Sequence, residues 1–344
     1  MKKHTPALAL FTLLAAAAGS ASAQSSVTVF GVVDVNGRYV KNGDTNVKQL
    51  GTDGLNSSRL GFRGVEDLGD GLKAGFWLEA ALNPDDGTIN SSGKFWHRRS
   101  TVSLEGNFGE IRLGRDYTPS YTGISDFDAF GDNGVGKFSN LQSKLTGTVN
   151  TNTRADNEIN YFLPKNLGGA YGQVTVAAGE GTLGNKYVGG RIGYAAGPLN
   201  VSGSYGTTDA NATEDKYKVG SLGVSYDLGV VKLLGSVSQI KFLDRKENLL
   251  LVGASAPLGN GLVRASVGRA NLSGGTTATQ TADADDATLV AVGYVYNLSK
   301  RTALYTTASR INNKGAQKFA VGTTPAIAAG QKSTGFEAGL RHSF

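Results

Sequence analysis

The sequence contains no cysteine, and among its 344 residues only 7 are proline and 3 are histidine. Without cysteine the chain has neither disulfide bonds nor thiolate metal ligands. His97 and His342 lie far apart, which disfavours a histidine metal site and a Ser-His-Asp triad. No Gly-x-x-x-x-Gly-Lys-Ser pattern is present to hold a phosphate group. The sequence therefore gives no support for an enzyme, a metal site or a bound cofactor.

Long hydrophobic runs are also scarce. A membrane-spanning helix needs roughly 20 apolar residues, and no run beyond residue 23 is that long. The first residues combine a basic start (Lys2, Lys3), an apolar stretch over 7–18 and the small-residue sequence Ala21-Ser22-Ala23. This pattern is typical of a cleaved signal peptide rather than an anchor. We therefore predict a signal peptide at 1–23 and a single mature domain at 24–344.

Charge is only weakly biased. The formal net charge is +6, from 34 basic and 28 acidic residues. The arginines are spread along the chain without a basic run, so the pattern does not indicate a nucleic-acid partner. The positions of individual arginines matter more for function than this sum.

What the sequence does contain is period-two alternation. Phe336, Ala338, Leu340, His342 and Phe344 share one strand face, opposite polar residues and glycine. A strand in a membrane barrel turns its apolar face to lipid and its polar face to a wet lumen. We count sixteen candidate strands, at 27–39, 58–67, 72–82, 96–105, 109–117, 157–163, 170–179, 186–196, 198–208, 216–228, 229–242, 246–257, 261–272, 286–298, 300–312 and 333–344. The pattern predicts an all-β, sixteen-stranded antiparallel transmembrane barrel.

Short turns and long polar connections mostly alternate between these strands, as in outer-membrane barrels. The longest connection is 118–156, which carries the acids Asp126 and Asp128 as well as three phenylalanines. A long connection without periodicity is usually functional or disordered, and its aromatic content argues against simple disorder. We expect this loop to fold into the lumen and narrow it.

Several motifs, taken together and in order, resemble the trimeric general porins of Gram-negative bacteria, in particular the β-proteobacterial branch that includes anion-selective porins. They are SVTVFGVVD at 26–34, SRLGFRGVEDLG at 58–69, LKAGFWLE at 72–79, RRSTVSL at 98–104, GEIRLGRD at 109–116 and GLRHSF at 339–344. The resemblance covers the mature chain. It implies a homotrimer in the outer membrane, with the third extracellular loop folded into each pore as a constriction.

The same resemblance implies a basic cluster on the barrel wall that faces acids on the inward loop. By position Arg59, Arg98 and Arg154 match the cluster, and Glu79 matches a lumen carboxylate. Alternation independently turns Arg59, Arg154 and Glu79 inward, and Arg63 joins Arg59. For the pair Arg98 and Arg99, strict alternation favours Arg99, whereas a bulge would turn Arg98 inward. Both therefore stay candidates, with Asp126 and Asp128 as the loop acids.

These features predict a general-diffusion channel for small hydrophilic solutes and ions, with a preference for anions, and no cofactor. A substrate-specific channel would need a ladder of lumen aromatics, which we do not find. A barrel enzyme would need a histidine-based site, and an adhesive barrel would not need inward arginines.

Three further partners are expected. Phe344 resembles the terminal aromatic that the outer-membrane insertion machinery reads. The apolar stretch 27–35 would supply the contact between subunits of a trimer. A loop that carries Asp283, Asp285 and Asp286 would hold divalent ions against lipopolysaccharide.

Overall fold

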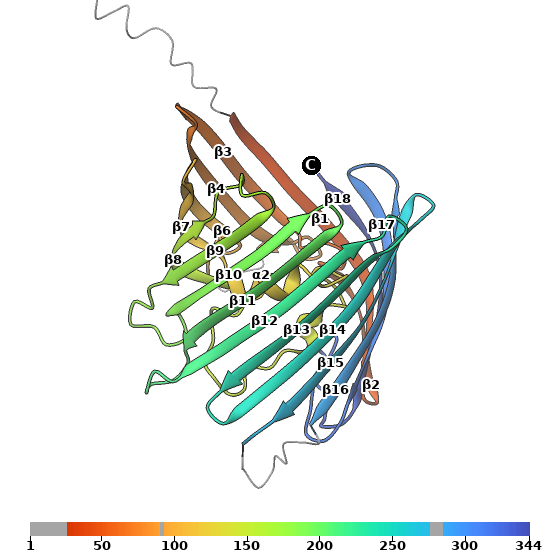
Figure 1. Ribbon diagram of the computed structural model, residues 1–344. Coiled ribbons are helices and arrows are strands. Elements are labelled where there is room, and N and C mark those ends of the chain that lie inside the picture. Colours follow the sequence, from red (N-terminus) through yellow and green to blue (C-terminus); the bar gives the residue numbers. More distant parts are fainter. Residues whose placement is uncertain (1–25, 90–92, 276–284) are drawn as a thin grey trace, which may run out of the picture.

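The strands of this chain close into one antiparallel barrel (Figure 1). A computed structural model describes residues 26–89, 93–275 and 285–344, so the expected signal peptide lies outside the described residues. The strands are β1 Ser26–Asn42, β2 Thr45–Thr52, β3 Arg59–Gly69, β4 Leu72–Asn83, β5 Thr88–Ile89, β6 Arg99–Gly106, β7 Gly109–Tyr117, β8 Arg154–Phe162, β9 Ala170–Ala177, β10 Tyr187–Ala196, β11 Leu199–Asp209, β12 Lys216–Asp227, β13 Lys232–Phe242, β14 Arg245–Leu258, β15 Gly261–Ser273, β16 Asp286–Asn297, β17 Thr302–Asn313 and β18 Lys332–Ser343.

Eighteen labelled strands form sixteen positions around the barrel. The first part of β1 pairs with β3, and its second part pairs with β2. β2 and β3 are therefore two halves of one barrel strand, interrupted at 53–58, and the two-residue β5 pairs only with the end of β4. The predicted sixteen-stranded barrel is confirmed. The expectation of a long loop between the predicted strands at 27–39 and 58–67 is wrong over 45–52, which is β2. That segment is polar, and it becomes a strand because an unusually long β1 offers it a partner.

The two chain ends close the barrel against each other. β1 and β18 pair from Val32–Ser343 to Asn42–Ser333. Beyond this ladder, the Gly31 N–H donates to the Phe344 carbonyl (3.0 Å) and the Phe344 N–H donates to the Gly31 carbonyl (3.1 Å). A Cβ atom at Gly31 would lie 2.3 Å from Cζ of Phe344. Glycine is required there because the terminal aromatic ring lies directly over the backbone.

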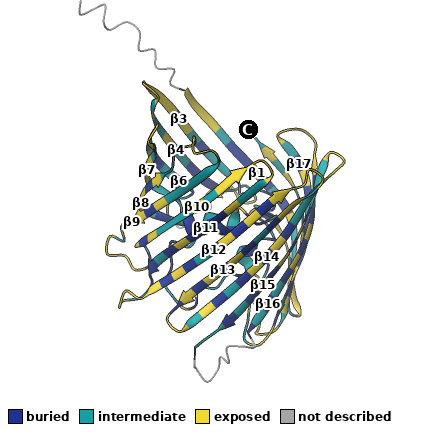
Figure 2. Cartoon of the chain, viewed as in Figure 1, coloured by how far each residue is buried: buried dark blue, intermediate teal, exposed yellow. Residues whose placement is uncertain are grey.

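Exposed and buried residues lie on opposite faces of the barrel wall (Figure 2). Along most strands exposed and buried residues alternate, and the exposed set is rich in large apolar side chains such as Ile192 (68% exposed) and Leu222 (65%). The opposite set includes many small or polar residues, for example Ser202 and Ser221. It also includes apolar residues such as Leu251 and Leu289, which belong to one buried cluster with Phe138 of the inward connection. No helix in the described part of the chain has the length and apolar character needed to span a bilayer.

The connection between β7 and β8 lies inside the barrel (Figure 1). It contains the helix α2 Pro119–Ser125 and the 3₁₀ helix η1 Phe138–Leu141. Its aromatic residues Phe127, Phe130 and Phe138 are almost fully buried. The inner wall beneath them is built from small residues, because a larger side chain would collide with the loop. These wall residues are Ser204, Ser221, Gly223, Gly253, Gly268, Ala291, Gly293 and Gly335.

Polar contacts fasten this loop to the wall. The Glu337 carboxylate accepts the Val135 N–H (3.2 Å), and the Glu247 carboxylate accepts the Ser143 N–H (3.0 Å). Ser309 Oγ donates to the Val135 carbonyl at 2.7 Å. The loop is thus attached along the wall formed by β11 to β18, and the lumen beside β3 to β7 is left to the arginines.

Candidate functional site in the barrel lumen

One carboxylate organises the predicted basic cluster. Glu79 on β4 accepts a hydrogen bond from Arg98 Nε at 2.5 Å, and its Oε1 lies 3.5 Å from an Arg59 guanidinium nitrogen. The Trp77 indole N–H donates to the other carboxylate oxygen at 3.0 Å. Glu79 is only 7% exposed. A buried carboxylate needs such partners, because its desolvation is otherwise costly.

The alternatives Arg98 and Arg99 both reach the inner side of the wall. β6 begins at Arg99, which pairs with Glu79 in the strand register. Arg98 precedes the strand, and its backbone N–H donates to the Glu79 carbonyl. Alternation restricts side chains only within a strand, so Arg98 is free to turn toward Glu79 as well. No bulge is needed to place both residues there.

Arg154 joins the cluster through an aromatic ring. Its guanidinium lies 4.0 Å from the ring centre of Tyr117, and the Tyr117 hydroxyl accepts a hydrogen bond from Arg98 at 3.2 Å. Tyr117 also stacks on Tyr121 of α2, with ring centres 5.0 Å apart. Tyr117 therefore holds two arginines and connects them to the inward loop.

The local backbone explains why strict alternation was a weak guide to Arg154. β8 begins at Arg154, three residues earlier than predicted. A register shift between β7 and β8 follows, and Asn157 adopts a left-handed conformation with φ of 55°. Such a bulge interrupts the alternation. Arg154 reaches the cluster through its contact with Tyr117.

Arg63 and Arg99 form a second group around Trp77. Their guanidinium carbons lie 5.3 and 4.5 Å from its ring. Arg99 also approaches Asp116 at 3.4 Å, and Asp116 in turn pairs with Arg112. Arg99 thus has a further acid beside it in Asp116, whereas Arg63 lies over the rings of Phe30 and Trp77.

The two predicted loop acids do not contact Arg59, Arg98 or Arg154. Asp126 pairs with Arg191 of β10 at 2.6 Å. Asp128 is buried within the loop, where it accepts backbone N–H groups of Phe130, Asp132 and Phe138 at 2.9–3.2 Å. Burial raises the pKa of Asp128 to about 6, against the opposing effect of these hydrogen bonds. Asp128 therefore shapes the loop from within.

His97 lies partly buried beside the arginines of the cluster. Its Nδ1 is buried and has no hydrogen-bond partner among the described residues. Burial, followed by the positive charges of Arg154, Arg98 and Arg115, lowers the pKa of His97 to about 4. His97 is thus neutral at neutral pH, because burial and the neighbouring arginines both disfavour its charged form.

Sequence reasoning missed the aromatic supports of the arginines. In the sequence Trp77 lies two residues before Glu79, so alternation puts both side chains on the inward face. A tryptophan beside an inward carboxylate is the signal that could have indicated this support. Tyr117 was assigned only to a strand end, and nothing in its local sequence links it to Arg98 or Arg154. The described residues contain no cluster of three or more side chains suited to hold a metal ion.

Comparison with known proteins agrees with this architecture. A family model described as Gram-negative porin matches residues 9–316. The chain is 41% identical to outer membrane porin protein 32 of Delftia acidovorans over 367 aligned positions, with all of both chains covered. This chain belongs to the Gram-negative porin family. As a porin it is a passive outer-membrane channel, and not an enzyme.

A comparison with solved structures agrees with the resemblance, stated above, to the branch that includes anion-selective porins. The anion-selective porin from Comamonas acidovorans superposes with a TM-score of 0.84 at 39% identity, covering 93% of this porin and all of that chain. OmpT of Vibrio cholerae reaches a TM-score of 0.67 at 16% identity, over 94% and 98% of the two chains. The second likeness concerns the fold alone. The predicted family and barrel are confirmed.

Proposed function

We propose that this porin prefers anions to cations, and that Arg59, Arg98 and Arg154 set the preference. The observation that carries the proposal is the charge balance of the cluster. Arg59 and Arg98 share the carboxylate of Glu79, and Arg154 adds a third guanidinium group through its contact with Tyr117. The loop acids Asp126 and Asp128 have other partners, so neither of them offsets the surplus.

The physical mechanism follows from the setting of this surplus. Arginine keeps its charge at every physiological pH. Salt screens charges over about 8 Å at physiological ionic strength, so only a narrow passage lets two uncompensated charges act on every passing ion. We infer that the loop at 118–153, attached to the opposite wall, supplies that narrow passage. The low-dielectric wall then focuses the field into the remaining space.

Two lines of support are independent of each other. The pKa of His97 is lowered first by burial and then by the positive charges of Arg154, Arg98 and Arg115, which supports an excess of positive charge beside the cluster. The solved structure that superposes at 39% identity carries the name anion-selective porin. The selectivity of that protein is its own property, and we extend it to this porin as a proposal.

The mature form and assembly complete the proposal. We propose cleavage after residue 23 and a homotrimer. The exposed apolar residues Val27, Val29 and Val33 on the outer face of β1 would supply self-complementary area between subunits. Phe344 would be read by the insertion machinery, in keeping with its position at the barrel seam. Of the acids proposed to face lipopolysaccharide, Asp283 lies outside the described residues, and Asp286 accepts hydrogen bonds from Arg269 and Asn271.

A single-channel experiment tests the function. The purified porin is inserted into a planar bilayer that separates two potassium chloride concentrations. A reversal potential of the sign set by chloride is expected, and the anion preference should weaken as total salt rises. A reversal potential of the sign set by potassium would refute the anion preference and leave the porin assignment unaffected.

A further inference from the structure

Three lysines form a row on the outer surface of the barrel. Lys218 on β12 is the direct cross-strand partner of Lys241 on β13, and Lys241 is the direct partner of Lys246 on β14. All three are exposed, whereas the next residues along each strand are buried. They therefore point away from the lumen, at the barrel end opposite Phe344 (Figure 1).

This arrangement is unfavourable for the isolated chain. Like charges directly opposite each other on adjacent strands destabilise a sheet. Among the ion pairs of the described residues, none includes Lys218, Lys241 or Lys246. Neighbouring acids are partly engaged, since Asp209 pairs with Lys186 and Lys216, and Asp215 with Asn211 and Thr213. Glu214 also lines the hollow that contains Lys218 and Lys241. The row thus presents a surplus of positive charge to an external anion.

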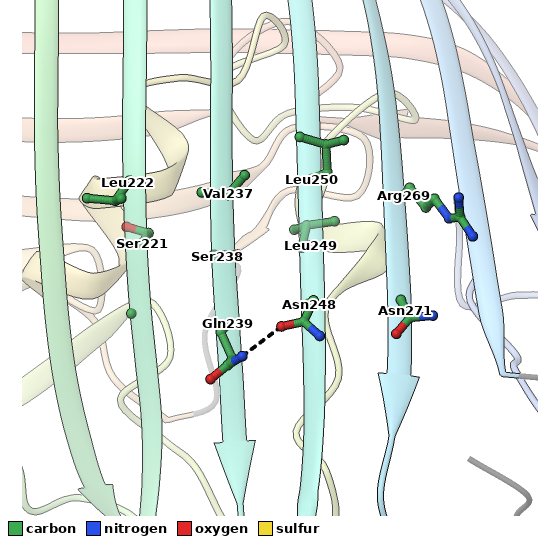
Figure 3. A pocket seen from close by; sticks show the side chains of 11 residues that line it. Ser221, Leu222, Val237, Ser238, Gln239, Asn248, Leu249, Leu250, Arg269 and Asn271 are labelled. Atoms are coloured by element: carbon green, nitrogen blue, oxygen red, sulfur yellow. Dashed lines mark hydrogen bonds between the residues drawn. The ribbon is translucent and has the colours of Figure 1, made fainter. Parts of the chain in front are cut away.

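An apolar groove lies next to the row, toward the middle of the wall (Figure 3). The groove has a volume of about 490 Å³. Leu222, Val237 and Leu250 supply its apolar floor, and Gly220 leaves room because it has no side chain. A polar rim separates the floor from the lysines, with Gln239 donating to Asn248 at 2.8 Å. A charged row, a polar rim and an apolar floor follow one another along the same strands.

The same order of charged, polar and apolar parts is found along a phosphorylated lipid in a membrane, from its phosphate groups to its acyl chains. We propose that the outer wall of β12 to β15 binds a phosphorylated glycolipid of the outer leaflet, with its phosphate groups on Lys218, Lys241 and Lys246 and an acyl chain against Leu222, Val237 and Leu250. Charge complementarity identifies the occupant, because each phosphate relieves the repulsion between two lysines. The site rests on the outer-membrane location of the porin and is independent of the proposed anion preference.

The test compares two triple variants of the full-length porin in detergent. In the first, Lys218, Lys241 and Lys246 are all replaced by serine. In the matched control, Lys165, Lys232 and Lys300, which lie near the opposite barrel end, are replaced by serine. Binding of bisphosphorylated lipid A is measured by native mass spectrometry. We expect at least a tenfold loss of affinity in the first variant, no more than a twofold change in the control, and weaker binding of lipid A to the wild type at high salt.

Further ligands and variants separate the two parts of the site. Dephosphorylated lipid A should bind the wild type at least tenfold more weakly than the bisphosphorylated form. Gly220→Leu should weaken lipid A binding by filling the groove, since a Cβ there meets only ordinary contacts at 3.5 Å. Equal affinity of the lysine variant and the wild type would overturn the proposal, as would an equal loss in the control. Displacement of lipid A by inorganic phosphate at the same concentration would also overturn the proposal, because the lysines would then bind a free anion as well as a lipid.

The reversal potential keeps this proposal distinct from the channel function. The lysine variant should show the same reversal potential as the wild type, because its substitutions lie outside the lumen. Loss of lipid binding with unchanged selectivity supports the site. Loss of selectivity in this variant would mean that the lysines act on permeating ions, and would overturn their assignment to a lipid surface.

Discussion

Replacing Arg59 and Arg154 together with serine tests the lumen cluster most directly. The double variant keeps the ion pair between Arg98 and Glu79, whose atoms lie 2.5 Å apart, and removes the two charges that this pair does not neutralise. Arg59 is only loosely held by Glu79 at 3.5 Å, and Arg154 loses mainly its contact with the Tyr117 ring. We therefore expect a loss of stability on the order of 1 kcal/mol and an intact barrel.

The size of the electrostatic effect can be worked out from Coulomb's law. In water, one unit charge acts on an ion about 6 Å away with about 0.7 kcal/mol. Screening at physiological salt leaves roughly half of this. Two charges attract an anion and repel a cation, so the difference between the two ions is about 1.4 kcal/mol. The ratio of anion to cation permeability should therefore fall by about tenfold in the double variant.

The assay is the reversal potential of single channels in a potassium chloride gradient. A matched control replaces Arg301 and Arg310 with serine, since both are exposed and lie outside the lumen cluster. The control removes the same formal charge and should leave the reversal potential unchanged. A reversal potential that stays the same in the Arg59 and Arg154 variant, with normal conductance, would refute the role of the cluster in selectivity.

Three further predictions concern the same cluster and the barrel seam. Glu79→Gln should increase the anion preference and lower the stability by about 1–3 kcal/mol, because Arg98 loses its counter-charge; unchanged selectivity would mean that ions do not sense this carboxylate. The pKa of His97 is lowered from 6.5 to about 4 in the folded protein. Its contribution to stability is therefore full above pH 6.5 and is lost as the pH falls toward 4. Its contribution to anion preference should appear only near pH 4 and vanish in His97→Ala, and a His97-dependent change between pH 8 and 6 would contradict the low pKa. Deletion of Phe344 should reduce the amount of SDS-resistant, heat-dissociable trimer in the outer membrane, as judged on gels, and unchanged trimer bands would argue against an assembly role.

The alternation of side chains determined much of this protein at the level of sequence. Because successive residues in a strand point to opposite faces, the lipid-facing apolar rows and the inward positions of Arg59 and Glu79 follow from local pattern alone. All sixteen predicted strands fall within a few residues of observed ones. The pattern did not predict β2, because this polar segment becomes a strand only by pairing with the long β1.

The tertiary structure decided what local pattern does not encode. The orientation of Arg98 depends on where β6 begins, and the place of Arg154 depends on the ring of Tyr117. Asp128 reads as a lumen acid in sequence, yet the fold of the loop turns it onto three backbone N–H groups. The small residues along β11 to β18 make room for this loop, a role visible only when the barrel has closed around it. Strand faces repeat over two residues and are read locally. The contact between Arg154 and Tyr117 and the packing of the loop on the wall join residues far apart in the sequence. The hydrogen bonds of Asp128 depend on a loop conformation that has no such repeat.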